Sequence, residues 1–206
     1  MRYILFGDSI AFGMNDLLKK GWAGRLKKHI HKNKKGELKG KLFVNYAVSG
    51  YTSNDILKIL EKKAKKRINK HPRDKFTIII AVGANDSKHH KFNPKKDIQK
   101  KEFEKNILKI IEISKRLAKK VIVIGLIPVY EKKINSLNRI CCFSNSNIII
   151  YNNILKNCSK KESVRFIEIY NYFIKKDINK LLSDGLHPNR KGHQLIFEHL
   201  INSKIV

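Results

Sequence analysis

The sequence has few of the residues that cross-link, break or anchor a polypeptide chain. Its 206 residues include three cysteines, four prolines and one tryptophan. Cys141 and Cys142 are adjacent, Cys158 lies well downstream, and no C-x-x-C pair occurs. The cysteines therefore indicate neither a disulfide framework, nor a zinc ribbon, nor a redox motif. This cysteine usage favours a reducing compartment, and we expect a cytoplasmic protein.

Long hydrophobic runs are absent as well. The longest candidate, 121–130, has the size of a strand. No run approaches the roughly 20 residues that a membrane-spanning helix needs. The apolar stretch within residues 1–6 is too short for the apolar region of a signal peptide. We therefore expect neither a transmembrane segment nor a secretory signal.

Acidic residues are scarce relative to basic ones. The chain has 45 lysines and arginines against 17 aspartates and glutamates, which gives a net charge of +28. Such a surface attracts polyanions such as nucleic acid and anionic lipid headgroups. The basic residues are spread along the whole chain, which favours a solvated surface of biased composition. A polyanion-binding function stays open as the alternative, and so does an enzyme whose basic surface gathers an acidic substrate.

Apolar residues make up 42% of the chain and come in dense blocks. A chain of this length buries about 70% of its unfolded surface when it folds. We therefore expect one folded domain over residues 1–206, without need of a stabilising metal or disulfide.

Strand-sized apolar blocks alternate with lysine-rich amphipathic stretches. The blocks are apolar on both faces, as in parallel sheets covered by helices, and predict strands at 3–6, 42–48, 76–82, 121–129 and 164–169. Apolar residues at helical spacing predict helices at 22–32, 54–68, 98–119, 145–156, 174–182 and 190–203. Thr52 and Asp55 predict the start of the second helix. The alternation predicts an α/β fold, a flavodoxin-like three-layer α/β/α sandwich with a five-stranded parallel sheet.

Candidate site residues follow three of these strands at the edge where such sheets hold their active sites. Ser9 follows the first strand and can present its hydroxyl there, or it can cap a helix. Gly50 follows the second strand and either exposes a backbone N–H to a ligand or serves a turn. Asn85 follows the third strand and either donates a hydrogen bond into the same crevice or forms an Asx-turn.

The segment Asp184-Gly-Leu-His-Pro188 offers a base with an orienting carboxylate. A nucleophilic serine needs such a pair. The three-residue spacing lets the carboxylate of Asp184 reach Nδ1–H of His187 while Nε2 points outward. The segment is also a plausible turn by itself.

The four segments occur in one chain in the order serine, glycine, asparagine and aspartate/histidine. In this order they resemble the SGNH hydrolases, also called the GDSL esterase/lipase superfamily, which is marked by four blocks holding Ser, Gly, Asn and His. The blocks match here as Gly7-Asp8-Ser9, Asn45-Tyr-Ala-Val-Ser-Gly50, Gly83-x-Asn85-Asp86 and Asp184-x-x-His187. The first block reads GDSI where the family name implies leucine. The resemblance covers about residues 3 to 200.

This resemblance implies the SGNH hydrolase fold and a serine ester hydrolase. Ser9 would be the acylated nucleophile. His187 would take its proton and return one to the leaving alcohol, and Asp184 would hold the imidazole in the correct tautomer. The backbone N–H groups of Ser9 and Gly50, with the side-chain amide of Asn85, would form the oxyanion hole.

No metal and no cofactor is required by the resemblance. The pairs His89-His90 and His29-x-His31 lack a third ligand, so we expect solvated histidines. Asp8 is expected to hydrogen-bond its own loop. The chain has no large insertion to serve as a lid, which favours small acyl groups, acetyl among them, and the loop 10–21 is expected to line the pocket. The expected partner is a small-molecule ester, with weak non-specific polyanion binding through the basic surface.

Overall fold

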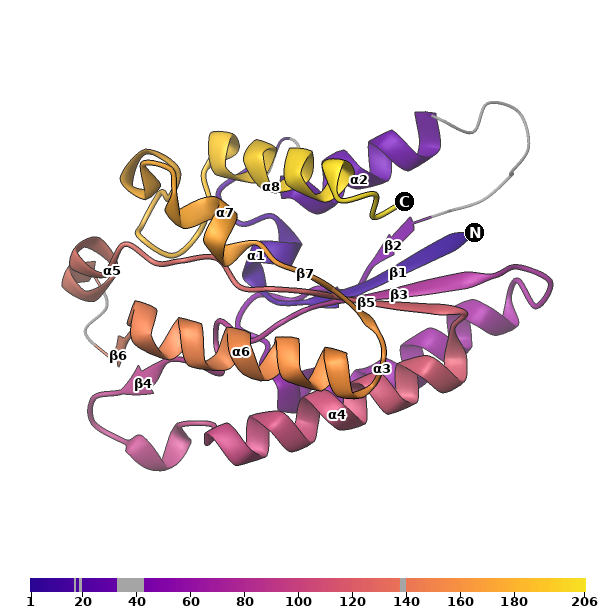
Figure 1. Ribbon diagram of the computed structural model, residues 1–206, viewed down its shortest axis with the longest axis horizontal. Coiled ribbons are helices and arrows are strands. Elements are labelled where there is room, and N and C mark those ends of the chain that lie inside the picture. The colour runs from indigo at the N-terminus through magenta and orange to yellow at the C-terminus, as the bar shows by residue number, and fades with distance from the viewer. Residues whose placement is uncertain (17, 19, 33–42, 138–139) are drawn as a thin grey trace.

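The computed structural model of the protein describes residues 1–16, 18, 20–32, 43–137 and 140–206. A five-stranded parallel sheet lies between two layers of helices (Figure 1). Its strand order is β2-β1-β3-β5-β7. The strands are β1 (Arg2–Gly7), β2 (Phe43–Asn45), β3 (Phe76–Ala81), β5 (Lys120–Ile124) and β7 (Arg165–Ile167). The predicted three-layer α/β/α sandwich is confirmed.

The longer helices divide between the two faces of the sheet (Figure 1). One face carries α2 (Gly21–Lys32) and α8 (Arg190–Asn202). The other carries α3 (Ser53–Asn69), α4 (Lys100–Leu117) and α6 (Asn145–Lys161). The short helices are α1 (Ser9–Phe12), α5 (Glu131–Leu137), α7 (Tyr170–Ile174) and the 3-10 turns η1 (Pro94–Lys96) and η2 (Ile178–Lys180). None of the described helices has both the length and the apolar character needed to cross a bilayer.

Alternating side chains of β1 serve two separate cores. Ile4 and Phe6 pack with the α3–α4–α6 layer, whereas Leu5 packs with the α2–α8 layer. All three side chains are fully buried, and full burial of a side chain of this size contributes about 1.5–3 kcal/mol. The two-sided burial explains why the strand is apolar at successive positions from Tyr3 to Phe6 instead of at alternate ones.

Most predicted boundaries lie within a few residues of the observed ones, and the predicted cap of α3 is confirmed. Helix α3 begins at Ser53 with Thr52 as its N-cap. The carboxylate of Asp55 accepts hydrogen bonds from the Thr52 backbone N–H (3.1 Å) and hydroxyl (2.8 Å).

Three predicted strands are too long, among them the strand predicted at 164–169, which is limited to Arg165–Ile167. The strand predicted at 121–129 ends at Ile124, and the backbone N–H groups of Leu126 and Val129 donate to the side chains of Asn152 and Asn145. The apolar residues after Ile124 are therefore buried without belonging to the sheet. The strand predicted at 42–48 is limited to Phe43–Asn45, and position 42 lies outside the described residues.

The helix predicted at 174–182 is wrong. Helix α7 ends at Ile174, and a separate 3-10 turn covers Ile178–Lys180. The apolar spacing was misleading because Ile174 is exposed, whereas Leu182 is buried and forms a bridge with Pro188. The elements α1, α5, η1 and the short pair β4 (His89–His90) and β6 (Cys141–Cys142) were not predicted.

Candidate active site

The first candidate residue, Ser9, lies where β1 meets α1. Asp8, not Ser9, is the N-cap: its Oδ1 accepts a hydrogen bond of 3.0 Å from the backbone N–H of Ile10. Ser9 is thereby the first residue of the helix, and its side chain is free to point out of the sheet edge. Its Oγ lies 2.9 Å from Nε2 of His187, a residue 178 positions further along the chain.

The other ring nitrogen of His187 contacts Asp184, which is close to it in the sequence. Nδ1 of His187 lies 2.6 Å from Oδ2 of Asp184. The other oxygen, Oδ1, accepts hydrogen bonds from the backbone N–H groups of Leu186 (2.9 Å) and His187 (2.7 Å). Burial acts to raise the pKa of Asp184, but the hydrogen bonds from the His187 side chain and the two backbone amides outweigh it and hold this pKa well below its usual range. Asp184 is therefore ionised beside the imidazole.

Three N–H donors stand at the same edge of the sheet. Among the described residues, none accepts a hydrogen bond from the backbone N–H of Ser9 or of Gly50. Gly50 has φ +83°, and an added Cβ would meet no atom within 4 Å, so glycine is required by backbone conformation and not by space. Asn85 donates from Nδ2 to the carbonyl oxygen of Tyr51 (3.0 Å), and an amide nitrogen has a second N–H to donate.

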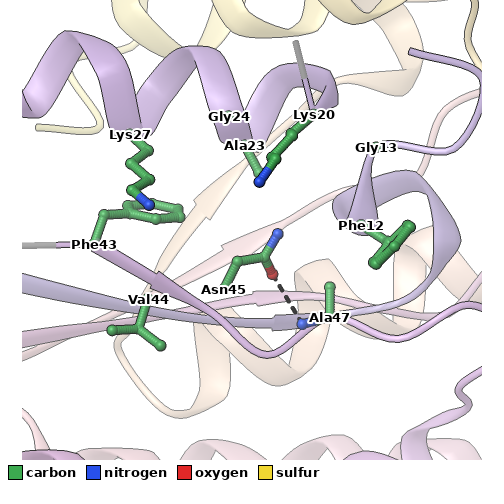
Figure 2. Close-up of a pocket in the computed structure, with 10 residues that line it drawn as sticks. All are labelled: Phe12, Gly13, Lys20, Ala23, Gly24, Lys27, Phe43, Val44, Asn45 and Ala47. Atoms are coloured by element: carbon green, nitrogen blue, oxygen red, sulfur yellow. Dashed lines mark hydrogen bonds between the residues drawn. The ribbon is translucent and has the colours of Figure 1, made fainter. Parts of the chain in front are cut away.

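All of these groups line one open cleft of about 620 Å³. Its far wall is apolar and comes from α5, β6 and the residues around them: Ile134, Leu137, Ile140, Cys141, Phe143 and Leu186. The expected lining by the loop 10–21 is not found in its described part, because Phe12, Gly13 and Lys20 line a different pocket (Figure 2). The constant three-residue spacing of 134, 137, 140 and 143 was the one sequence signal for this wall.

A match to a known family extends over nearly the whole chain. The model of the GDSL-like lipase/acylhydrolase family matches residues 3–200. The chain belongs to this family. As a GDSL-family member it is a carboxylic ester hydrolase, as the resemblance implied.

Solved structures of GDSL-family proteins and related esterases share the fold. A lipase/acylhydrolase from Enterococcus faecalis has a TM-score of 0.72 at 22% identity, with 98% of this chain and 95% of that chain covered. A lipolytic G-D-S-L family protein from Veillonella parvula has 0.71 at 18%, covering 98% and 97%. An acetylxylan esterase from Geobacillus stearothermophilus has 0.73 at 17%, covering 98% and 92%. No curated protein matches this chain significantly.

Two buried carboxylates brace the loops of the GDSL-family site. Asp86 accepts hydrogen bonds from the backbone N–H (2.9 Å) and hydroxyl (2.6 Å) of Ser53, which ties the loop carrying Asn85 to the start of α3. Burial raises the pKa of Asp86 to about 6 and that of Asp8 to about 7. The expectation that Asp8 hydrogen-bonds its own loop is confirmed, whereas the bracing by Asp86 was not anticipated.

The histidine pairs do not form a metal centre in the part of the chain that is described. The expectation that His89 and His90 are solvated is wrong for His90, whose side chain is 14% exposed. Both imidazoles contact the carboxylate of Asp97, with His90 Nδ1 at 2.7 Å from Oδ1. Asp97 lies in the segment before α4. The sequence spacing did not predict its contact with the two histidines.

Proposed function

We propose that this protein is a serine ester hydrolase in which Ser9, His187 and Asp184 form the catalytic triad of one domain over residues 1–206. The observation that carries the proposal is the chain of two contacts, Ser9 Oγ to His187 Nε2 at 2.9 Å and His187 Nδ1 to Asp184 Oδ2 at 2.6 Å. Such a chain joins a nucleophile to a base and the base to an orienting carboxylate. Catalytic mutants of the acetylxylan esterase from Geobacillus stearothermophilus likewise replace a serine or an aspartate by alanine.

In the acylation step, Ser9 Oγ attacks the carbonyl carbon of the ester while its proton moves to Nε2 of His187. The tetrahedral intermediate then collapses. The bond from the carbonyl carbon to the alcohol oxygen breaks, and that oxygen takes the proton from Nε2. Ionised Asp184 stabilises the imidazolium that exists between the two proton transfers. In the deacylation step a water molecule gives one proton to Nε2 of His187 and attacks the acyl carbon. The bond from this carbon to Ser9 Oγ then breaks, Oγ takes the proton back from Nε2, and the acid leaves.

The oxyanion of both tetrahedral intermediates is assigned to three N–H donors. These are the backbone groups of Ser9 and Gly50 and the second N–H of the Asn85 side chain. The hydrogen bond from Asn85 to Tyr51 fixes the amide before substrate arrives. Donors fixed in advance stabilise developing charge without reorganisation, and each contributes about 2.7–4 kcal/mol to lowering the barrier.

We propose small acyl groups, acetyl among them, as the substrates. Two features support this. The cleft is open and no described insertion covers it, and the fold is shared with two acetylxylan esterases.

The test is a series of p-nitrophenyl esters from acetyl to octanoyl. Wild-type kcat/KM should be highest at the short end. Ser9→Ala should lower kcat by about four to six powers of ten while leaving the circular dichroism spectrum unchanged. Ser49→Ala is the matched control, since Ser49 lines the same cleft without contacting His187. Near-wild-type turnover by Ser9→Ala, or an equal loss in Ser49→Ala, would contradict the proposal.

A further inference from the structure

A second pocket lies on the α2 side of the molecule, outside the cleft that holds the triad. Its volume is about 410 Å³, within the range of roughly 300–1,000 Å³ that is typical of small-ligand sites. Figure 2 shows it between the first two turns of α2, strand β2 and the end of α1. None of its lining residues belongs to the triad or to the proposed oxyanion hole.

The floor and one side of this pocket are apolar. Phe43, Ala23 and Ala47 are almost completely buried, and each leaves part of its surface facing the hollow. Phe12, at the end of α1, is 46% exposed and stands at the side (Figure 2). A large apolar side chain that stays this exposed beside a hollow offers a surface for the ring or hydrocarbon part of a ligand.

The polar groups of the pocket are two amines and one fixed amide. The side chains of Lys20 and Lys27 extend from the α2 side toward β2 (Figure 2). Neither amine pairs with a carboxylate among the described residues, and the lining contains no acidic residue. The side chain of Asn45 is held in place by its bonds to the Ala11 carbonyl oxygen (2.9 Å) and the Ala47 backbone N–H (2.8 Å).

Close backbone packing positions Lys20 at the wall. Gly13 has φ +99°, and a Cβ there would lie 2.4 Å from the backbone carbon of Lys20. Lys20 itself has φ +54°, a left-handed conformation that lysine seldom adopts and that costs stability. The chain around Gly13 and Gly21 therefore maintains a strained backbone that places the ammonium group of Lys20 at the edge of an apolar hollow.

We propose that this pocket binds a small organic anion, a carboxylate or phosphate carried on a ring-sized apolar body. The two ammonium groups and the free N–H of Asn45 would bind the anionic group. Phe12 and the buried floor would receive the body. The proposal needs no activity at Ser9, because the pocket shares no catalytic group with the cleft.

Benzoate and phenyl phosphate are suitable probes, and benzyl alcohol is the neutral control. We expect both anions to shift the backbone amide resonances of Ala23 and Gly24 in ¹H–¹⁵N spectra, and benzyl alcohol to shift them far less. The double variant Lys20→Ala/Lys27→Ala should raise the dissociation constant for both anions by at least about tenfold, the usual order for loss of a charged hydrogen-bonding partner. Both lysines are exposed, so the variant should fold normally.

Two controls make the test decisive. Lys28→Ala removes one positive charge from α2, next to Lys27, at a position that does not line the pocket, and it should leave the affinity within about twofold of wild type. Enzyme phosphonylated in the catalytic cleft should bind the anions as unmodified enzyme does. Absent binding, an equal loss in Lys28→Ala, an unchanged affinity in the double variant, or competition by the phosphonate would each overturn the proposal.

Discussion

Two hollows flank α1, and they differ in whether a carboxylate faces them. Asp184 lines the cleft together with Lys88, whereas none of the described lining residues of the second pocket is acidic. In the cleft proposed as the active site, the carboxylate of Asp184 is paired with His187, whose Nε2 lies near Ser9 Oγ. In the pocket of Figure 2 the charges of Lys20 and Lys27 have no acidic partner among the described residues. A paired charge orients a base and moves a proton, whereas an unpaired charge attracts a ligand. The net charge of +28 describes neither arrangement, because it counts charges without regard to their partners.

The two hollows also differ in how the chain builds them. The cleft collects residues from loops after several strands, with Ser9 and His187 separated by 178 positions. The pocket comes from one stretch of the chain, from Phe12 to Ala47. Changes in one hollow should therefore leave the other intact, and the predictions below use that independence.

After Ser9→Ala, the largest effect on kcat is expected from Asp184→Asn. The substitution removes the charge that orients His187 and stabilises its imidazolium, so kcat should fall by about four powers of ten. Stopped-flow and steady-state assays with p-nitrophenyl acetate measure the loss. Benzoate affinity at the pocket should be unchanged, and a parallel loss of both would show that the two hollows are not independent.

Asp184→Asn should also change stability in acid. Because the folded-state pKa of Asp184 is lowered, its ionised form stabilises the fold above the unfolded-state pKa of about 3.9. That contribution is lost as pH falls from there through the folded pKa. Urea unfolding from pH 6 to pH 2 should therefore show a smaller loss of stability in the variant than in the wild type. Parallel curves would argue against the paired carboxylate.

Asp8→Asn should change the pH dependence of stability in the opposite direction. Burial raises the folded pKa of Asp8 to about 7, so the fold binds the proton that the unfolded chain releases near pH 4. Stability from Asp8 is complete below pH 4 and is lost as pH rises to about 7, by up to roughly 4 kcal/mol for three pKa units. Asparagine retains the cap to Ile10 without titrating. The difference in unfolding free energy between wild type and variant should move over this window, and a constant difference would contradict the raised pKa.

Asn85→Ala should lower kcat by about two to three powers of ten and change KM much less. The amide is expected to bond the oxyanion more strongly than the ground-state carbonyl, so its loss affects the transition state. Steady-state kinetics with p-nitrophenyl acetate separate the two constants. A change confined to KM would make Asn85 a substrate contact instead of an oxyanion donor.

The smallest effect is expected from salt on the hydrolysis of a neutral ester. Neither the substrate nor the proposed proton relay needs long-range attraction, so kcat/KM should stay level from 50 to 500 mM sodium chloride. Benzoate binding at the lysine pocket should weaken over the same range, because exposed charges are screened within about 8 Å at physiological ionic strength. If kcat/KM and benzoate affinity depended equally on salt, the claim that the two hollows use charge differently would be contradicted.

The sheet and most of the long helices could be predicted because burial leaves a strong periodic signal. Strand β3 is apolar at five of its six positions, with Thr77 as the exception, because both of its faces are covered. The same signal failed after Ile124, where Leu126 and Val129 are buried but bonded to asparagine side chains. Burial and strand pairing are separate properties, and a sequence pattern reports mainly the first.

The candidate site was predictable in its members but not in its surroundings. Ser9, Gly50, Asn85 and the Asp184/His187 pair follow strand ends, where the parallel topology brings loops together. The apolar wall from α5 and β6 could not be predicted in the same way, because its contacts depend on how two short elements pack beside the cleft. The pocket lined by Lys20 and Lys27 could not be predicted. Lysines occur along the whole chain, so two of them do not mark a site.

The most direct test of the central claim is labelling with a serine-directed fluorophosphonate, followed by mass spectrometry of the digested protein. The account predicts one equivalent of label, located on Ser9, with esterase activity falling in proportion to labelling. The variant Ser9→Ala should take up no label and show no turnover. Stoichiometric labelling of a different serine, or full activity in protein labelled at Ser9, would contradict the assignment of Ser9 as the nucleophile.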